Sequence, residues 1–132
     1  MPLEVETRNL PGRATALGSA GPFTLTVDRP SDAGGGGRGF SGGELLYLAV
    51  AGCISNDLFR EAADRGVTLD RVVVKVAGDF TGDPAISAEI TYSVEITGSA
   101  SDEELRLLVE HVDKIAEIPN SLRRATQVRL RT

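Results

Sequence analysis

Cys53 is the only cysteine among the 132 residues and the side chain best suited to redox or nucleophilic chemistry. A thiolate attacks electrophiles and can be oxidised by peroxides. Asn56 and Asp57 follow at i+3 and i+4, and Arg60 continues the same stripe, so these residues share a helix face with Cys53. Arg60 would favour a thiolate and Asp57 would oppose it. We therefore take Cys53 as the candidate catalytic residue and Asn56, Asp57 and Arg60 as candidate binding residues.

A structural role is the alternative interpretation of Cys53. Free cysteine is among the most buried residue types and behaves as a small hydrophobe. The cysteine would also lie about three turns into its helix, where the positive end of the helix dipole has little effect on a thiol. Activation of the thiol would therefore need a cation from elsewhere in the chain.

The other residues typical of enzyme sites form no recognisable group. His111 is the only histidine and lies at the edge of an apolar helical stripe, which is typical of a boundary residue. One histidine and one cysteine cannot by themselves bind zinc, and no further ligand stands at a metal-binding spacing. We expect no metal and no cofactor.

A long helix predicted for residues 40–66 carries Cys53. A capping box opens it, because Ser41 can accept from the backbone N–H of Glu44 while Glu44 reaches back to that of Ser41. Its last residue is a glycine, which can adopt the left-handed conformation that ends a helix. Residues 45–51 are almost all apolar, which predicts a helix buried on all sides. One small sheet cannot cover so much apolar surface, so we expect a homodimer in which each subunit buries the other's helix.

Alternating apolar and polar residues predict antiparallel strands on both sides of this helix. The predicted strands are residues 3–8, 13–17, 23–27, 71–80, 86–97 and 126–131. A second capping box at residues 101–104 opens an amphipathic helix that ends near Pro119. Because the strands arrive as hairpins rather than singly between helices, the fold class is α+β and not doubly wound. Residues 34–37, all glycine, lack the Lys-Ser/Thr of a phosphate-binding loop, and we predict a mobile connector there.

Length and composition indicate one domain over residues 1–132. The net charge of −5 gives no electrostatic support for a nucleic-acid or acidic-membrane partner. A single cysteine excludes an internal disulfide and fits a reducing compartment. We see no signal peptide, and the longest apolar run is far shorter than the roughly 20 residues of a membrane span. We therefore expect a cytoplasmic protein that binds neither nucleic acid nor membrane.

Residues 42–62 read GGELLYLAVAGCISNDLFREA, and the segments SDEEL and IPNSL follow towards the C-terminus. Together with the glycine-rich loop and the order of the elements, these segments resemble the OsmC/Ohr family along almost the whole chain. The resemblance implies an α+β fold and an intertwined homodimer, with two central helices buried between the subunits' sheets. It also implies a role in the bacterial response to oxidative stress, because many members are thiol peroxidases that reduce organic hydroperoxides. In those members a peroxidatic cysteine attacks the peroxide and a second cysteine resolves the sulfenic acid.

The resemblance extends to the cysteines only in part. Cys53 falls where the peroxidatic cysteine belongs. The family's resolving cysteine precedes a proline on the later helix, but Ile118 precedes Pro119 here, so no resolving cysteine is present. An oxidised Cys53 would therefore stay a sulfenic acid until an external thiol reduced it, or would be oxidised irreversibly to the sulfinic acid.

An arginine and a glutamate assist the peroxidatic cysteine in the family. The family's glutamate lies ten residues before the cysteine; that position is Gly43 here, and Glu44 stands one place later. One residue corresponds to a rotation of about 100° around a helix, so Glu44 points in a different direction from the family's glutamate. The family's arginine follows the first strand, so either Arg8 or Arg13 would supply it. The resemblance thus implies Glu44 and one of these two arginines as further catalytic residues.

Two functions are compatible with these residues. The first is a thiol-dependent organic hydroperoxide reductase with one cysteine, a pocket at the dimer interface and an external thiol as reductant. The second is a non-catalytic binding module in which Cys53 lines a pocket for a small apolar or thiol-bearing ligand. The ionisation of the thiol separates them, because a reactive cysteine must form a thiolate more readily than free cysteine does.

Overall fold

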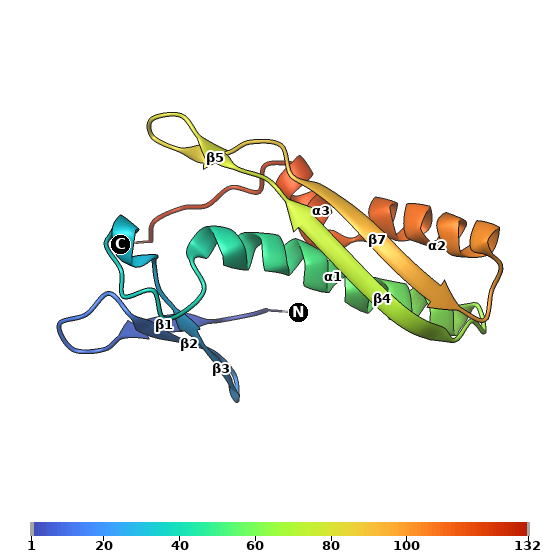
Figure 1. Ribbon diagram of the computed structural model, residues 1–132, viewed down its shortest axis with the longest axis horizontal. Helices are drawn as coiled ribbons and strands as arrows, with labels where there is room; N and C mark the ends of the chain where they lie inside the picture. Colours follow the sequence, from blue (N-terminus) through green and yellow to red (C-terminus); the bar gives the residue numbers. More distant parts are fainter. Residues whose placement is uncertain (1, 132) are drawn as a thin grey trace. The chain divides into compact units, whose positions relative to one another are not determined.

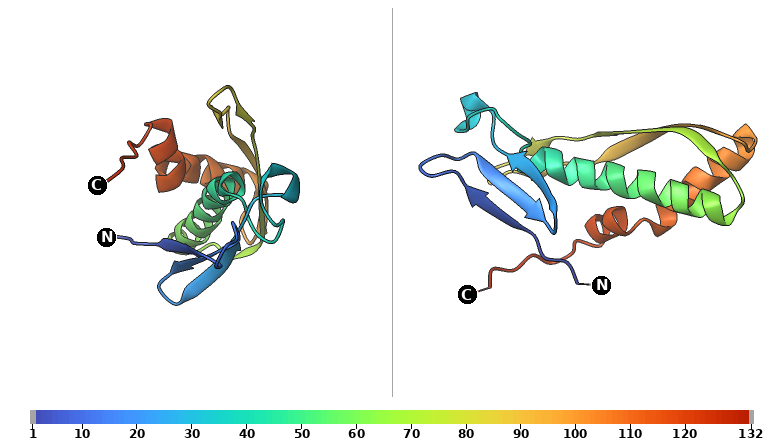
Figure 2. Two further views of the ribbon diagram at one scale, coloured as in Figure 1. Left: turned by 90° about the vertical axis from the view of Figure 1, so that its left-hand side faces the viewer. Right: turned by 90° about the horizontal axis from the view of Figure 1, so that it is seen from below.

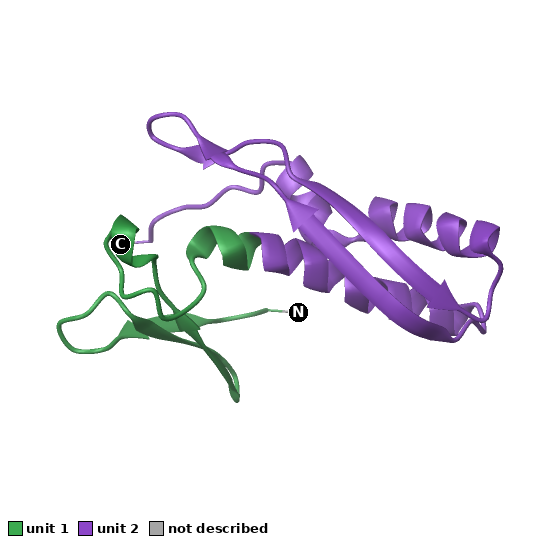
Figure 3. Ribbon diagram, viewed as in Figure 1, with its two compact units in different colours: residues 1–46 green, residues 47–132 purple. Residues whose placement is uncertain are grey.

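The computed structural model describes residues 2–131, and Figure 1 shows the order of their helices and strands. The chain divides into two compact units, Met1–Leu46 and Tyr47–Thr132, which Figure 3 distinguishes by colour. The long helix α1 (Gly42–Asp64) begins in the first unit and continues in the second. A single domain over the whole chain stays a prediction.

The N-terminal unit contains a three-stranded antiparallel sheet in the order β1-β2-β3. Its strands are β1 (Glu6–Asn9), β2 (Ala16–Ala20) and β3 (Phe23–Val27). Gly21 takes a positive φ of 56° in the tight turn between β2 and β3, a conformation that favours glycine. The hairpin predicted from the sequence is therefore confirmed. Strands β1 and β2 both begin later than predicted, because their ladder runs only from the Glu6–Ser19 pair to the Asn9–Ala16 pair.

A buried carboxylate holds the glycine-rich loop that follows β3, which includes the short 3₁₀ helix η1 (Ser31–Ala33). Asp28 is 4% exposed. It accepts hydrogen bonds from Thr15 Oγ1 and from the backbone N–H groups of Arg29, Gly36 and Arg38, over 2.8–3.2 Å. These bonds, first of all that from Thr15, lower the pKa of Asp28 from 3.8 to about 2. The chain passes so close to itself that a Cβ at Gly35 would lie 2.2 Å from the Arg29 carbonyl oxygen. The predicted mobile connector is thus a loop folded around a buried side chain.

Both halves of the predicted capping box form at the start of α1. The backbone N–H of Ser41 donates to Glu44 Oε1 (2.9 Å), and that of Glu44 donates to Ser41 Oγ (3.2 Å). The bonds from Ser41 lower the pKa of Glu44. The helix ends at Asp64, and Gly66 follows with a φ of +69°, as predicted. Local sequence therefore determines both ends of α1.

The C-terminal unit packs helices against an antiparallel pair of strands. Its elements after α1 are β4 (Leu69–Ala77), β5 (Phe80–Thr81), β6 (Ile86–Ser87), β7 (Thr91–Gly98), α2 (Asp102–Ile115) and α3 (Glu117–Arg123). Strand β4 pairs with β7, and the short strands β5 and β6 pair at the tip of the same hairpin. The β4–β7 ribbon runs alongside α1 in Figures 1 and 2. The predicted hairpin over residues 71–97 is confirmed, with a break in the ladder between its long base and its tip.

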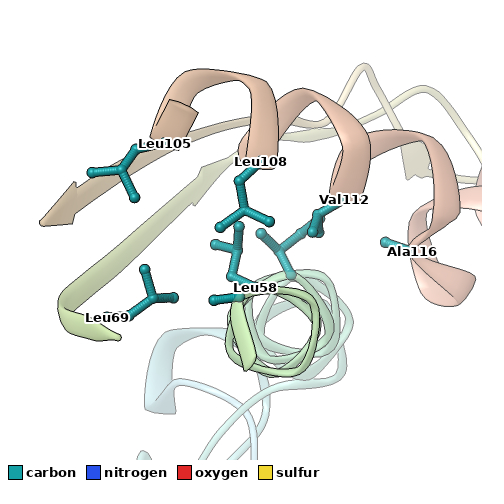
Figure 4. Packing of buried hydrophobic residues seen from close by; sticks show 8 residues of the cluster. Leu58, Leu69, Leu105, Leu108, Val112 and Ala116 are labelled. Atoms are coloured by element: carbon teal, nitrogen blue, oxygen red, sulfur yellow. The ribbon is translucent and has the colours of Figure 1, made fainter. Parts of the chain in front are cut away.

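The hydrophobic core of this unit lies between α1, α2 and the β4–β7 ribbon. Its buried members are Ile54, Leu58, Ala62, Leu69, Leu105, Leu108, Val112 and Ala116. Figure 4 shows Leu58 of α1 facing Leu108 and Val112 of α2. Half of the predicted capping box forms at the start of α2, where Ser101 Oγ accepts from the backbone N–H of Glu104 at 3.2 Å. The Ser101 hydroxyl, and not its backbone N–H, donates to Glu104 Oε1 at 3.0 Å. The packing of α2 on α1 therefore places the second half of α1 in a fixed environment.

Helix α1 is not buried on all sides within one chain. Its buried residues lie along one face of the helix and are Val50, Ile54, Asp57, Leu58 and Ala62. Leu48 and Phe59, by contrast, are 49% and 48% exposed. Only one face of the helix meets the core, in line with the expectation that one chain cannot cover it, and burial of the other faces by a second subunit stays a prediction.

The end of the chain also differs from the prediction. Helix α2 ends at Ile115, and Pro119 lies in the first turn of α3, where a proline is tolerated. Residues 126–131 form no strand with any described residue, although their sequence alternates. Their apolar side chains Val128 and Leu130 are 94% and 87% exposed. The predicted closing strand is absent because no strand edge in the described chain pairs with it.

Candidate functional site

Cys53 lies midway along α1 with a free, partly buried thiol. It packs against the hydrophobic core between α1 and α2. Its Sγ donates a hydrogen bond to Oδ2 of Asp57, one turn further along the helix, at 3.9 Å. Asp57 is only 8% exposed. The sulfur is therefore half-sheltered, and a nearly buried carboxylate is its hydrogen-bond partner within residues 2–131.

Arg60 offsets the charge of that carboxylate. Its Nη1 lies 3.1 Å from Oδ1 of Asp57, and its Nε lies 3.3 Å from Oε2 of Glu61. The hydrogen bond to Glu61 and the charge of Asp57 raise the pKa of Arg60. A guanidinium bound to Asp57 reduces the repulsion that the carboxylate would exert on a thiolate. In this site Asp57 therefore opposes a negative charge on the sulfur, and Arg60 partly compensates for the charge of Asp57.

Glu61 extends this network from α1 to α2. Its Oε1 lies 2.8 Å from Nε2 of His111, and Nη1 of Arg65 lies 3.7 Å from the same oxygen. The bond to His111, followed by that to Arg60, lowers the pKa of Glu61, although burial acts in the opposite direction. A continuous series of polar contacts therefore connects the thiol on α1 to the imidazole ring on α2.

Asn56 does not join this network. Its side chain is exposed and forms no hydrogen bond with the described part of the chain. Its position at i+3 still places it on the side of α1 that carries Cys53. A binding role for Asn56 stays a prediction.

The other predicted site residues belong to the N-terminal unit. Arg8 forms an exposed ion pair with Glu6 at 3.2 Å. Arg13 is exposed in the loop between β1 and β2. Glu44 is engaged in the cap of α1. The assistance to Cys53 that the resemblance implies for these residues stays a prediction.

The sequence gives only indirect signals of the contact between Glu61 and His111. The two residues are 50 positions apart and lie on different helices. The available signals are the polar stripe that runs from Arg60 to Glu61 and the position of His111 beside an apolar stripe. Because the packing of α2 on α1 creates the contact, a local pattern could not have identified the partners.

The chemistry open to these residues is that of a single thiol. A thiolate at Cys53 could attack an electrophilic oxygen and become a sulfenic acid. The sequence holds no second cysteine, so the return to the thiol would require a thiol from another molecule.

Residues 2–131 contain no cluster of three or more His, Cys, Asp or Glu side chains that could hold a metal ion. In the same range, no helix has the length and apolar character needed to cross a bilayer.

Comparisons with known proteins agree with the likeness noted in the sequence. A family model described as OsmC-like protein matches residues 34–131. A search of curated proteins by sequence gives no match.

Solved structures with the same fold cover nearly the whole chain. An OsmC-like protein from Mycoplasma pneumoniae has a TM-score of 0.81 and 19% identity, over 98% of this chain and 92% of that one. An organic hydroperoxide resistance protein OsmC from Legionella pneumophila has a TM-score of 0.66 and 18% identity, over 93% and 90%. The organic hydroperoxide resistance protein OhrB of Bacillus subtilis has a TM-score of 0.62 and 18% identity, over 93% and 91%. At these identities the likeness shows the fold, and it confirms the predicted α+β class.

Proposed function

This chain belongs to the OsmC-like protein family, and on that basis we propose that it is a one-cysteine reductase of organic hydroperoxides in the oxidative stress response. Two proteins of the same fold are organic hydroperoxide resistance proteins. The observation that carries the proposal is a free, partly buried thiol, Cys53, whose carboxylate partner is bound by Arg60. We place its action in the cytoplasm, because a lone thiol is readily regenerated in a reducing compartment.

The proposed reaction has two stages. The Cys53 thiolate attacks the terminal oxygen of the hydroperoxide, the O–O bond breaks, and the alkoxide leaves and takes a proton from solvent to become an alcohol. The cysteine is now a sulfenic acid. An external thiol then displaces water from the sulfur to form a mixed disulfide, and a second external thiol releases Cys53 as the thiol. The external reductant is thereby oxidised to a disulfide.

The proposed roles of the remaining residues follow from the family resemblance and from their charge. Arg8 or Arg13 would stabilise the thiolate, with assistance from Glu44. Asn56 and Asp57 would provide hydrogen bonds beside the sulfur. Arg60 lies 3.1 Å from Asp57, which supports its role in compensating the charge next to the thiol.

We also propose that the functional form is an intertwined homodimer with the substrate pocket at its interface. Leu48 and Phe59 leave an apolar part of α1 half exposed, and Val128 and Leu130 are almost fully exposed on an unpaired segment. Exposed apolar groups of this kind support association with a second copy. An apolar pocket between the copies would admit the organic part of the hydroperoxide.

One observation favours a second candidate function. The Cys53 thiol donates its hydrogen bond to the carboxylate of Asp57, which disfavours a negative sulfur. An unreactive thiol is what a binding module for a small apolar or thiol-bearing ligand would contain. In that case Cys53 would only line the pocket.

The test compares wild-type protein with Cys53→Ser in the consumption of cumene hydroperoxide, with dithiothreitol as the external reductant. If the protein is the proposed reductase, the wild type should consume the hydroperoxide rapidly and Cys53→Ser should show only the background rate. Ser55→Ala is the matched control, because it changes another hydroxyl-sized group on α1 and should keep the wild-type rate. Equal rates for wild type and Cys53→Ser would end the proposal and leave the binding module.

A further inference from the structure

Glu61 stands between a guanidinium and an imidazole that belong to different helices. Its Oε2 accepts from Nε of Arg60 at 3.3 Å, and its Oε1 lies 2.8 Å from Nε2 of His111. The Glu61 side chain is only 16% exposed, so solvent replaces these partners poorly. A change in the charge of one partner must therefore alter how strongly the carboxylate attracts the other.

Arg60 is shared between two carboxylates. Its Nη1 binds Asp57 at 3.1 Å, while its Nε binds Glu61. The Arg60 side chain is 58% exposed, which leaves it room to shift towards either partner. Any loss of attraction to Glu61 thus strengthens the pairing with Asp57, the residue that touches the Cys53 sulfur.

We propose that His111 is a positioning residue for the thiol and acts on it through Glu61 and Arg60. When His111 is protonated, it satisfies Glu61, and Arg60 pairs more closely with Asp57. The compensated carboxylate then repels a thiolate less. When His111 is neutral, Glu61 draws Arg60 away from Asp57 and the thiolate is less favoured. The inference deepens the proposed function, in which Cys53 is the attacking group.

Histidine is the residue type whose charge changes most readily near neutral pH, and His111 is the only histidine in the chain. The charged groups around it are Glu61, Arg60 and Arg65 on α1 and Lys114, which lies one turn along on α2. Carboxylates, guanidinium groups and primary amines as classes keep their charge between about pH 5.5 and 8. A change in thiol reactivity in this range, beyond the ionisation of the thiol itself, is therefore assigned to His111.

The test measures the rate of alkylation of Cys53 by iodoacetamide in the wild type and in His111→Gln, from pH 5.5 to 8. Gln keeps a hydrogen-bond donor but cannot carry the charge. The ratio of the wild-type rate to the His111→Gln rate cancels the effect of thiol ionisation, which both proteins share. It should be near 1 at pH 8 and rise to about 2 at pH 5.5, the size of effect typical of an exposed charge interaction. Lys114→Gln is the matched control, and its ratio to the wild type should not change with pH.

The same comparison in the Glu61→Gln protein tests whether the effect of His111 passes through Glu61. In Glu61→Gln the carboxylate link is lost, so adding His111→Gln should leave the alkylation rate unchanged at every pH. A flat ratio for His111→Gln in the wild-type background would overturn the proposal, and so would a His111→Gln effect that persists in Glu61→Gln. Alkylation needs no peroxide, so its outcome is independent of the hydroperoxide assay. If cumene hydroperoxide is not consumed but the ratio follows pH, the coupling stands and the proposed enzyme fails.

Discussion

Replacement of Asp57 by Asn should make the Cys53 thiol react faster. The change keeps the shape of the side chain and removes one negative charge 3.9 Å from the sulfur. At that separation two unit charges interact by about 1 kcal/mol at the dielectric constant of water and by about 2 kcal/mol at half that value. These energies correspond to a gain in thiolate of roughly fivefold to thirtyfold. Because Arg60 already offsets part of the Asp57 charge, we expect the lower end of this range, about fivefold.

The assay is the rate of iodoacetamide alkylation at pH 7, followed by the mass of the intact protein. Asp64→Asn is the matched control, since it removes a carboxylate from the same helix that does not contact the sulfur. Far-ultraviolet circular dichroism would establish that both variants are folded. The reasoning fails if Asp57→Asn is alkylated no faster than the wild type, or if Asp64→Asn gains the same factor.

Three further predictions concern stability and assembly. Leu58→Ala, at a fully buried core position, should lower the free energy of unfolding in urea by about 2–5 kcal/mol, whereas Leu107→Ala, at a position 50% exposed, should cost less than about 1 kcal/mol. The pKa of Asp28 is lowered from 3.8 to about 2, so its stabilising contribution is present above the higher value and disappears as the pH falls to the lower one; urea midpoints should therefore fall more steeply with acid in the wild type than in Asp28→Asn. Sedimentation should give a dimer mass at micromolar concentration for the wild type and a smaller mass after Leu48→Lys combined with Phe59→Lys, and a wild-type monomer would refute the predicted homodimer.

The parts of the fold that local chemistry decides could be predicted from the sequence. The capping box of Ser41 and Glu44 forms as predicted, and so does the cap that Ser101 provides for α2. Gly66 ends α1 with the positive φ that its type suggested. In each case the interacting groups are within four residues of one another, so no knowledge of the tertiary structure is needed. The first residues of β1 and β2 were harder to predict, because cross-strand pairing and not alternation determines where a strand begins.

The candidate site likewise contains contacts that the sequence predicts and one that it does not. Helical spacing indicated that Asp57 and Arg60 lie on the side of Cys53, and the structure contains the Cys53–Asp57 and Asp57–Arg60 contacts. The next contact, between Glu61 and His111, joins two helices and could not be predicted from either one. Spacing along a helix therefore identifies the near neighbours of the thiol, while the packing of α2 determines what those neighbours are bonded to.

Two sequence patterns are left without enough partners in a single chain for a common physical reason. A helix apolar all round and a strand of alternating residues are both patterns that require partners, and the single chain provides too few. Leu48 and Phe59 on α1 are left about half exposed, and Val128 and Leu130 at the end of the chain are almost fully exposed. Each square ångström of such surface costs about 25 cal/mol in water, so its exposure favours burial against another molecule. A second copy carries the same unsatisfied surfaces, and an association that covered them would also enclose the helix that bears Cys53. Assembly and the environment of the thiol are therefore expected to be linked through α1.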